Sequence, residues 1–435
     1  MPKTLKTSGF KSLPVRARIN RYEHQATKLR MAYRASLGDA IHRIRQYHPR
    51  LAGRANTNDR NSVTLSDLAK AGFNQSDARC VVARWHGFEN WRSLTRHVVQ
   101  VNRRRSPVAA FELAVEAIIT GKEATLTRLL KRHPDLVRAR STRWHRATLL
   151  HYVSANGVED FRQRTPLNIV AIANILLAAG AEVDADLDYG PEGSLVYPER
   201  KGSTTLGLAA TSYHPAVARV QIALLELLIQ AGASVDGLSG GWNPVIAALH
   251  NGRGEAAEFL AGKGARLDLE AAAGTGRLKA VKSYFGKTGL LGSKATRTQL
   301  EMGCQWACEY GHTDVVAFLL RQKLDVSATP HGETGMHWAC FGGHADIVKL
   351  LLDKNAPLEL RDQRFRATPL KWALQGWCYP PPEAVHGRYH EVVGLLVRAG
   401  ANPHVLAELN QGQREKLAQD SLMRTLLGAD NSRTV

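Results

Sequence analysis

The sequence has few cysteines, few acidic residues near its N-terminus and no long apolar run. It holds five cysteines in 435 residues, and three of them, Cys304, Cys308 and Cys340, are clustered, which does not fit an extracellular disulfide framework. No apolar stretch approaches the roughly 18 residues that a membrane-spanning helix needs. The basic N-terminal segment lacks the apolar core of a secretory signal. We therefore expect a cytoplasmic protein with reduced thiols.

Sequence motifs of several enzyme classes are also missing. The chain has no G-x-x-x-x-G-K-[ST] phosphate loop and no H-E-x-x-H metal helix. We therefore expect a protein that is not an enzyme and that needs no cofactor.

The net charge of +19 is concentrated at one end of the chain. Residues 1–105 hold 22 Lys and Arg against 6 Asp and Glu, whereas residues 106–435 hold 36 against 33. Such a basic block favours an anionic partner, whether a nucleic acid, an acidic protein or a membrane surface.

A repeat of about 33 residues organises the larger part of the chain. "GCQWACEYGHTDVVAFLL" from Gly303 and "GMHWACFGGHADIVKLLL" from Gly335 are identical at ten of eighteen positions. "TPLKWAL" from Thr368 follows Thr334 by 34 residues. Each unit predicts two short helices, joined by a Gly-His turn, and the second helix has a broad apolar face. One such pair cannot bury that face alone, so neighbouring copies must stack.

The T-P-L-H-x-A pattern at this period is the ankyrin signature, and the chain from about Phe111 to Leu427 resembles ankyrin-repeat proteins. More narrowly, "LLHYVSANGVEDFRQRTP" and "STTLGLAATSYHPA" are similar to a lineage of bacterial ankyrin-repeat proteins that brings no established activity with it. The resemblance implies an all-α solenoid of about seven units, some of them degenerate, acting as a non-catalytic scaffold for protein–protein interaction. The expected segments are a disordered basic arm (1–26), an arginine-rich helical module (27–103), a cap helix pair (106–145), ankyrin repeats (146–404) and a C-terminal cap and tail (405–435).

Three insertions lengthen the turn between the two helices of a unit. They follow Gly157, Ala210 and Leu374. Insertions confined to one edge of a repeat array often form a binding feature, although a surface loop is also tolerated at little cost.

The N-terminal module is expected to be a helical hairpin with an aromatic core. We expect Ser76 to cap one helix, Gly87 to follow its end and Asn90 to start the next helix. Its exposed faces should then carry arginines, which leaves open a nucleic-acid surface, an acidic protein partner or a solvated face that docks on the solenoid. These arginines are Arg30, Arg34, Arg43, Arg45, Arg79, Arg84, Arg92 and Arg96.

The Cys/His-rich stretch near residue 340 has two interpretations. His337, Cys340 and His344 could be metal ligands, since zinc takes four convergent Cys and His side chains. However, Cys308 and Cys340 occupy the same repeat position, where a small buried side chain fits, and His337 is placed to bond Thr334. We therefore expect no metal site. Trp306, Trp338 and Trp372 recur once per repeat and are expected in the core between repeats.

The resemblance implies that a partner binds the finger tips and the exposed side of the first helices. We expect this partner to be an acidic or aromatic peptide, because aromatic and arginine side chains are enriched at binding hot spots. Two alternatives remain: nucleic-acid binding through residues 1–105, and an enzyme with a pocket near His151 and His214. The oligomeric state stays open. The candidate binding residues are Tyr310, His331, Glu333, Phe341, Arg364, Phe365 and Arg366.

Overall fold

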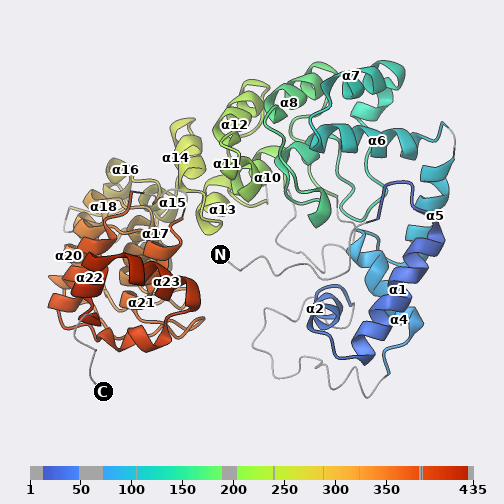
Figure 1. Cartoon of the computed structure of the whole chain (residues 1–435). Coiled ribbons are helices and arrows are strands. Elements are labelled where there is room, and N and C mark those ends of the chain that lie inside the picture. Colours follow the sequence, from blue (N-terminus) through green and yellow to red (C-terminus); the bar gives the residue numbers. More distant parts are fainter. Residues whose placement is uncertain are drawn as a thin grey trace. The chain divides into compact units, whose positions relative to one another are not determined.

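The computed structural model describes most of the chain as two compact units. These are residues 2–247 and residues 248–435, here called the N-terminal unit and the C-terminal unit. The described parts contain helices and three isolated β-bridges but no strand (Figure 1). None of the described helices is long and apolar enough to cross a membrane. The described residues are 13–48, 72–103, 105–188, 203–238, 241–287, 289–322, 324–381, 384 and 386–429.

The C-terminal unit is a stack of helix pairs in two rows. Each helix packs on its neighbours in the same row and on its partner in the other row (Figure 1), so the apolar faces form one continuous core. The inner row is α15 (Leu269–Gly274), α17 (Arg297–Glu309), α19 (Gly335–Phe341), α21 (Pro369–Cys378) and α23 (Gln411–Gln419). The outer row is α16 (Leu278–Lys282), α18 (Thr313–Leu320), α20 (Ala345–Leu352), α22 (Tyr389–Arg398) and α24 (Ser421–Leu426).

Local sequence signals set the ends of these helices. Thr334 caps α19, and its hydroxyl also bonds the His337 ring with 2.8 Å between Oγ1 and Nδ1. This confirms the predicted role of His337. Thr148 and His151 make the same 2.8 Å contact in the first repeat. Gly311 and Gly343 have φ near +79° and +68°, the left-handed conformation that ends the first helix of a pair and favours glycine.

His312 and His344 follow those glycines but do not cap the second helix with their side chains. Instead, Nε2 of His344 lies 2.8 Å from the Glu309 carbonyl, and Nε2 of His312 lies 3.0 Å from the Gly274 carbonyl. Each carbonyl belongs to the preceding repeat. The turn histidines therefore join successive repeats.

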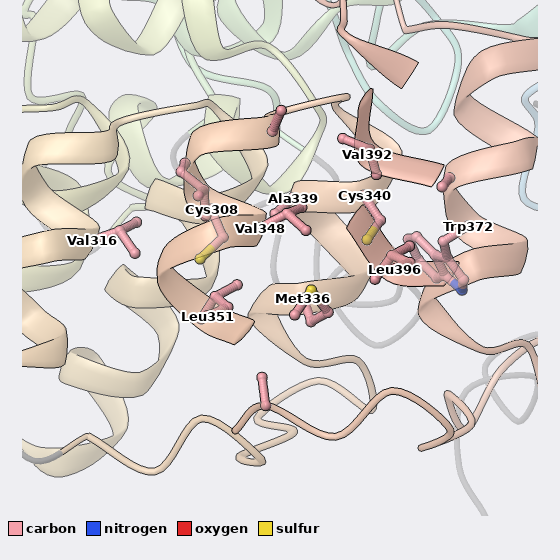
Figure 2. Close-up of a cluster of buried hydrophobic side chains, with 14 of the residues drawn as sticks. Cys308, Val316, Met336, Ala339, Cys340, Val348, Leu351, Trp372, Val392 and Leu396 are labelled. Carbon is pink, nitrogen blue, oxygen red and sulfur yellow. The ribbon is translucent and has the colours of Figure 1, made fainter. Parts of the chain in front are cut away.

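The core of the C-terminal unit is apolar and contains sulfur. Cys308, Cys340 and Met336 are fully buried among Val316, Val348, Leu351 and similar side chains (Figure 2). Each fully buried Val, Leu or Met side chain stabilises the fold by about 1.5–3 kcal/mol relative to exposure.

The N-terminal module packs its helices around an aromatic core, as expected. Helix α1 begins at Ile19 and buries Tyr22, Gln25 and Ala26, so the disordered arm predicted for residues 1–26 is wrong from Ile19 onward; residues 1–12 lie outside the described residues. Asn74, not Ser76, caps α4, because its side-chain oxygen Oδ1 accepts from the backbone N–H groups of both Ser76 and Asp77. The helices are α1 (Ile19–Arg34), α2 (Gly38–Tyr47), α4 (Gln75–Trp85) and α5 (Trp91–Asn102).

The rest of the chain up to the C-terminal rows continues in helix pairs. The first helix of the repeat that starts at Thr148 is a 3-10 helix. It is short because Ala155, which follows it, adopts the left-handed conformation (φ 48°) and ends it. The elements are α6 (Pro107–Ile119), α7 (Glu123–Arg132), η1 (Pro134–Val137), η2 (Leu150–Ser154), η3 (Asp160–Arg162), α8 (Ile169–Ala178), α10 (Thr205–Thr211), α11 (Tyr213–Val217), α12 (Gln221–Gln230), α13 (Pro244–His250), α14 (Gly254–Gly262) and, before α23, η6 (Pro403–Glu408).

Candidate functional site

The finger that precedes α21, residues 361–366, is held by one buried aspartate. The Asp362 carboxylate accepts the backbone N–H groups of Arg364 (2.8 Å), Phe365 (2.5 Å) and Ala367 (2.9 Å). It also accepts the Trp372 indole N–H at 3.1 Å. Burial alone would raise the pKa of Asp362, but these donors outweigh it and lower the pKa. The finger is therefore a fixed platform rather than a loose loop.

An aromatic patch lies where this finger meets the inner helices. We define it as Trp338, Phe341, Phe365 and Trp372. The Phe365 ring is 62% exposed; its centroid lies 6.2 Å from that of Trp372, and the Arg364 guanidinium lies 5.1 Å from the Phe365 centroid. Trp338 and Phe341 are half-buried and both contact Trp372, with centroids 4.9 and 5.8 Å away. Three of the candidate residues, Phe341, Arg364 and Phe365, thus meet at one surface.

A second cluster, the acidic patch, lies two repeats earlier in the same unit. We define it as His250, Glu270, Trp306, Tyr310 and His331. Trp306 donates its indole N–H to Oε1 of Glu270 at 2.8 Å, and its ring contacts those of Tyr310 and His331, with centroids 6.4 and 6.5 Å away. His331 is exposed and Tyr310 is half-buried. This cluster therefore contains two more of the candidate residues.

The two remaining candidate residues, Arg366 and Glu333, differ in their exposure. Arg366 is exposed, with φ near +55°, and its carbonyl accepts from the Arg361 side chain at 2.6 Å. Glu333 is only 7% exposed, so its predicted place on an open finger tip is wrong. Burial and the nearby Asp362 raise the pKa of Glu333. Its backbone belongs to the turn that starts α19, and this turn folds the side chain inward.

The three repeat tryptophans differ in a way that periodicity alone could not reveal. The indole N–H groups of Trp306 and Trp372 donate to Glu270 and Asp362. The buried Nε1 of Trp338 has no acceptor among the described residues. Trp306 and Trp372 are buried, as expected, but Trp338 is partly open to the aromatic patch.

The cysteine cluster is suited to packing. Burial raises the pKa of Cys340, and the neighbouring Cys304 together with burial raises that of Cys308, so both stay protonated thiols at neutral pH. A thiolate is the form that binds metals or acts as a nucleophile. Within the described residues, no group of three or more His, Cys, Asp or Glu side chains could hold a metal ion.

His151 and His214 do not fit the pocket of the enzyme hypothesis. His151 is completely buried, and burial followed by Arg140 lowers its pKa to about 3. A ring with no exposed surface cannot reach a substrate in this state. His214 lies on α11, half-exposed, with its ring against Tyr213.

A buried charge network in the N-terminal unit was missed by the sequence analysis. Its members are Glu112 on α6, Arg143, and Glu159 and Arg162 from the first insertion, and every side chain is at most 6% exposed. Arg143 and Arg162 both donate to Glu112 and both face Glu159. Burial would raise the pKa of Glu112, but the two arginines lower it to about 2. Glu112, one of two glutamates within the otherwise apolar run "FELAVEAII", was the signal that could have revealed it.

The same network joins the helical module to the first repeat. Arg143 donates from Nε to the His86 carbonyl at 3.2 Å, and Trp144 donates its backbone N–H to the Gly87 carbonyl at 3.0 Å. Tyr47 donates to Asp160 at 2.8 Å. The first insertion thus packs against the module, and its Glu159 and Arg162 side chains face inward rather than toward a partner.

The arginines predicted to be exposed on the module divide into two groups. Arg34, Arg45, Arg92 and Arg96 are exposed. The others are half-buried: Arg43 stacks on Trp85 at 4.1 Å, Arg79 pairs with Glu23 at 2.9 Å, and Arg30 and Arg84 lie partly covered.

Comparison with protein-family models supports ankyrin repeats in the C-terminal unit. Residues 269–362 and 304–407 match the family model described as ankyrin repeats (3 copies). The solved structure titled "Crystal structure of human ASB11 ankyrin repeat domain" is similar at 20% identity over 66% of this chain and 96% of that chain, with a TM-score of 0.33. No curated protein matches the chain. The fold is an all-α ankyrin solenoid, and ankyrin repeats generally mediate protein–protein interaction.

Proposed function

We propose that the protein is a non-catalytic scaffold that binds a partner protein through the groove of its C-terminal unit. The observation that supports this most directly is Phe365, a 62% exposed aromatic ring on a finger that Asp362 holds rigid. A rigid exposed aromatic loses little conformational entropy on binding, and aromatic and arginine side chains are the usual hot spots.

The surroundings of Phe365 favour a particular partner. Arg364 and Arg366 are exposed beside it, and the half-buried Trp338 and Phe341 extend the apolar surface along the inner helices. The site therefore suits an extended segment with an aromatic anchor next to an acidic residue. We expect this to take place in the cytoplasm, and the relation to a bacterial lineage stays a prediction.

The test is affinity capture from native cells with quantitative mass spectrometry. The full chain is compared with the triple variant Arg364→Ala, Phe365→Ala, Arg366→Ala. Leu422→Ala removes another exposed apolar side chain, 55% exposed on the cap helix α24, and serves as the matched control. Wild type and control should recover the same proteins and the triple variant should lose them. Unchanged recovery with the triple variant would contradict the proposal.

A second candidate function, nucleic-acid binding, is favoured by one face of α5. Arg92 and Arg96 are exposed one turn apart on α5, Arg103 is exposed directly after its end, and none of them has an acidic partner among the described residues. Exposed arginine side chains can each neutralise a phosphate.

Salt dependence tests this second candidate. If the three arginines each contact a phosphate, changing them to Gln should reduce the log–log salt slope of binding to a 20-base-pair DNA duplex by about 2.7. Changing Arg128, Lys131 and Arg132 of α7, which are also exposed, removes the same charge elsewhere. Equal losses in both triple variants would show that only net charge matters and would reject the α5 site.

A further inference from the structure

The acidic patch contains a carboxylate, Glu270, that has no lysine or arginine partner within the part of the chain that the structure describes. The Glu270 side chain is 14% exposed. The charged group that interacts with it is another carboxylate, Asp268, which repels it, and not a lysine or arginine. Burial raises the pKa of Glu270, whereas the Trp306 N–H opposes this rise. Keeping a mostly buried charge without a cationic partner costs stability, so such a group marks a candidate functional site.

His250 faces Glu270 and could supply a positive charge, but it does so poorly. Its Nε2 lies 3.7 Å from Oε1 of Glu270. Burial and then the neighbouring His331, whose ring centroid is 5.4 Å away, lower the pKa of His250. The imidazole is therefore mostly neutral at pH 7 and does not balance the charge of the Glu270 carboxylate.

The geometry of Glu270 leaves one oxygen for a ligand. Oε1 accepts from Trp306 and faces His250, which fixes the orientation of the carboxylate. Oε2 has no hydrogen-bond partner among the described residues, and it is not a buried unsatisfied atom. The Trp306 ring that bonds Glu270 also contacts the rings of Tyr310 and His331, and aromatic faces attract cations.

The acidic and aromatic patches lie along one row of inner helices. Glu270 is on α15, Trp306 on α17, Trp338 on α19 and Trp372 on α21, and each helix packs against the next. Packed helices are separated by about 8–10 Å. Three such steps span roughly 27 Å, which is the length of about eight residues of extended chain.

We propose that the groove binds a peptide segment with opposite charges at its two ends: a lysine or arginine at Glu270, and an acidic residue beside an aromatic anchor at Arg364 and Phe365, about eight residues away. This inference rests on the proposed function, and it adds the second contact and the spacing. Negative charge on the α15 side and positive charge on the finger set the direction in which the segment lies.

The experiment is selection of a displayed random 16-residue peptide library on three full-length proteins: wild type, Glu270→Gln and Phe365→Ala. Glutamine at 270 retains an oxygen that accepts from Trp306 but removes the charge. Wild type should enrich peptides with an aromatic-acidic pair and a basic residue seven to nine positions away. Glu270→Gln should keep the aromatic-acidic pair and lose the basic position. Phe365→Ala should lose the aromatic preference.

Failure of the two proposals can be told apart. If wild type and Glu270→Gln select the same peptides, with no basic position, the inference about Glu270 is wrong while the groove remains the binding site. If Phe365→Ala selects the same peptides as wild type, the proposed function is wrong as well. A synthetic wild-type-selected peptide should bind Glu270→Gln at least about tenfold more weakly, since hydrogen bonds between charged groups are strong.

A measurement without any ligand checks the same claim. The Glu270 carboxylate is mostly buried and has no lysine or arginine partner among the described residues, so its charge destabilises the fold. Glu270→Gln removes that charge and should raise the melting temperature. Glu301→Gln, which removes a carboxylate paired with Arg297 at 2.7 Å, should not raise it. A lower melting temperature for Glu270→Gln would show that the carboxylate is a structural partner and would overturn the inference.

Discussion

The two units of this protein are stabilised in opposite ways. The N-terminal unit encloses four charged side chains, Glu112, Arg143, Glu159 and Arg162, in its interior. The C-terminal unit stacks apolar and thiol side chains and keeps Glu270, which has no lysine or arginine partner among the described residues, at a partly exposed position. Buried ion pairs add little net stability, but breaking one is costly. The buried charge network of the N-terminal unit therefore specifies how the helical module packs on the first repeat. The arrangement in the C-terminal unit leaves a charge for a ligand.

The largest expected effect is breaking the buried network. Glu112→Gln leaves two buried arginines facing one glutamate, and we expect the free energy of unfolding of the N-terminal unit to fall by about 3–5 kcal/mol. Hydrogen exchange read by mass spectrometry measures this, because it reports each unit separately.

The matched control is Asp346→Asn in the C-terminal unit. Asp346 pairs with Arg388 at 2.7 Å, but both side chains are about half exposed, so the change should cost less than about 1 kcal/mol. Equal effects of the two substitutions would mean that the buried network has no special role.

The next largest effect is that of low pH, which should change the stability of the two units differently. The pKa of Glu112 is held near 2, below its usual 4.5, so its contribution is present above pH 4.5 and is lost as the pH falls toward 2. The pKa values of His86 and His97 are lowered to about 3 and 4, mainly by burial, so protonation favours unfolding once the pH falls below 6.5. The pKa values of Glu270 and Glu333 are raised, so the cost of these charges disappears at low pH.

Hydrogen exchange measured as the pH is lowered from 7 to 4 should therefore show that the amides of the N-terminal unit lose protection before those of the C-terminal unit. Loss of protection in the reverse order would contradict the charge assignments.

The fully buried Cys340 tests the apolar stack. Cys340→Ser places a hydroxyl among apolar side chains and should cost about 2 kcal/mol, whereas the same change at the half-exposed Cys378 should cost much less. Thermal unfolding measures both. Equal tolerance at the two positions would mean that the stack is looser than the contacts indicate.

The smallest effect distinguishes the three repeat tryptophans. Changing each to Phe removes the same volume, but only Trp306→Phe and Trp372→Phe lose a hydrogen bond to a carboxylate. These two variants should be about 1.5 kcal/mol less stable than Trp338→Phe. Chemical denaturation would measure the difference, and identical losses would refute the hydrogen-bond assignment.

The sequence was informative where residues recur. The identity between Gly303 and Gly335 onward predicted the stacked helix pairs, and the spacing of Thr334 and His337 predicted their bond. It could not show that Glu333 turns inward or that Glu112 meets Arg143, because such contacts join segments far apart in the chain and depend on how the repeats pack. The finger at 361–366 was predicted as a binding element, but its rigidity comes from Asp362, which no periodicity marks.

The central claim is that the groove of the C-terminal unit is the binding surface. The most direct measurement is hydrogen exchange of the full chain with and without the peptide that wild type selects. The account predicts added protection at the finger (361–366), along α19 and α21 and around Glu270, and none at α5. Protection confined to α5 or to the insertions would contradict it.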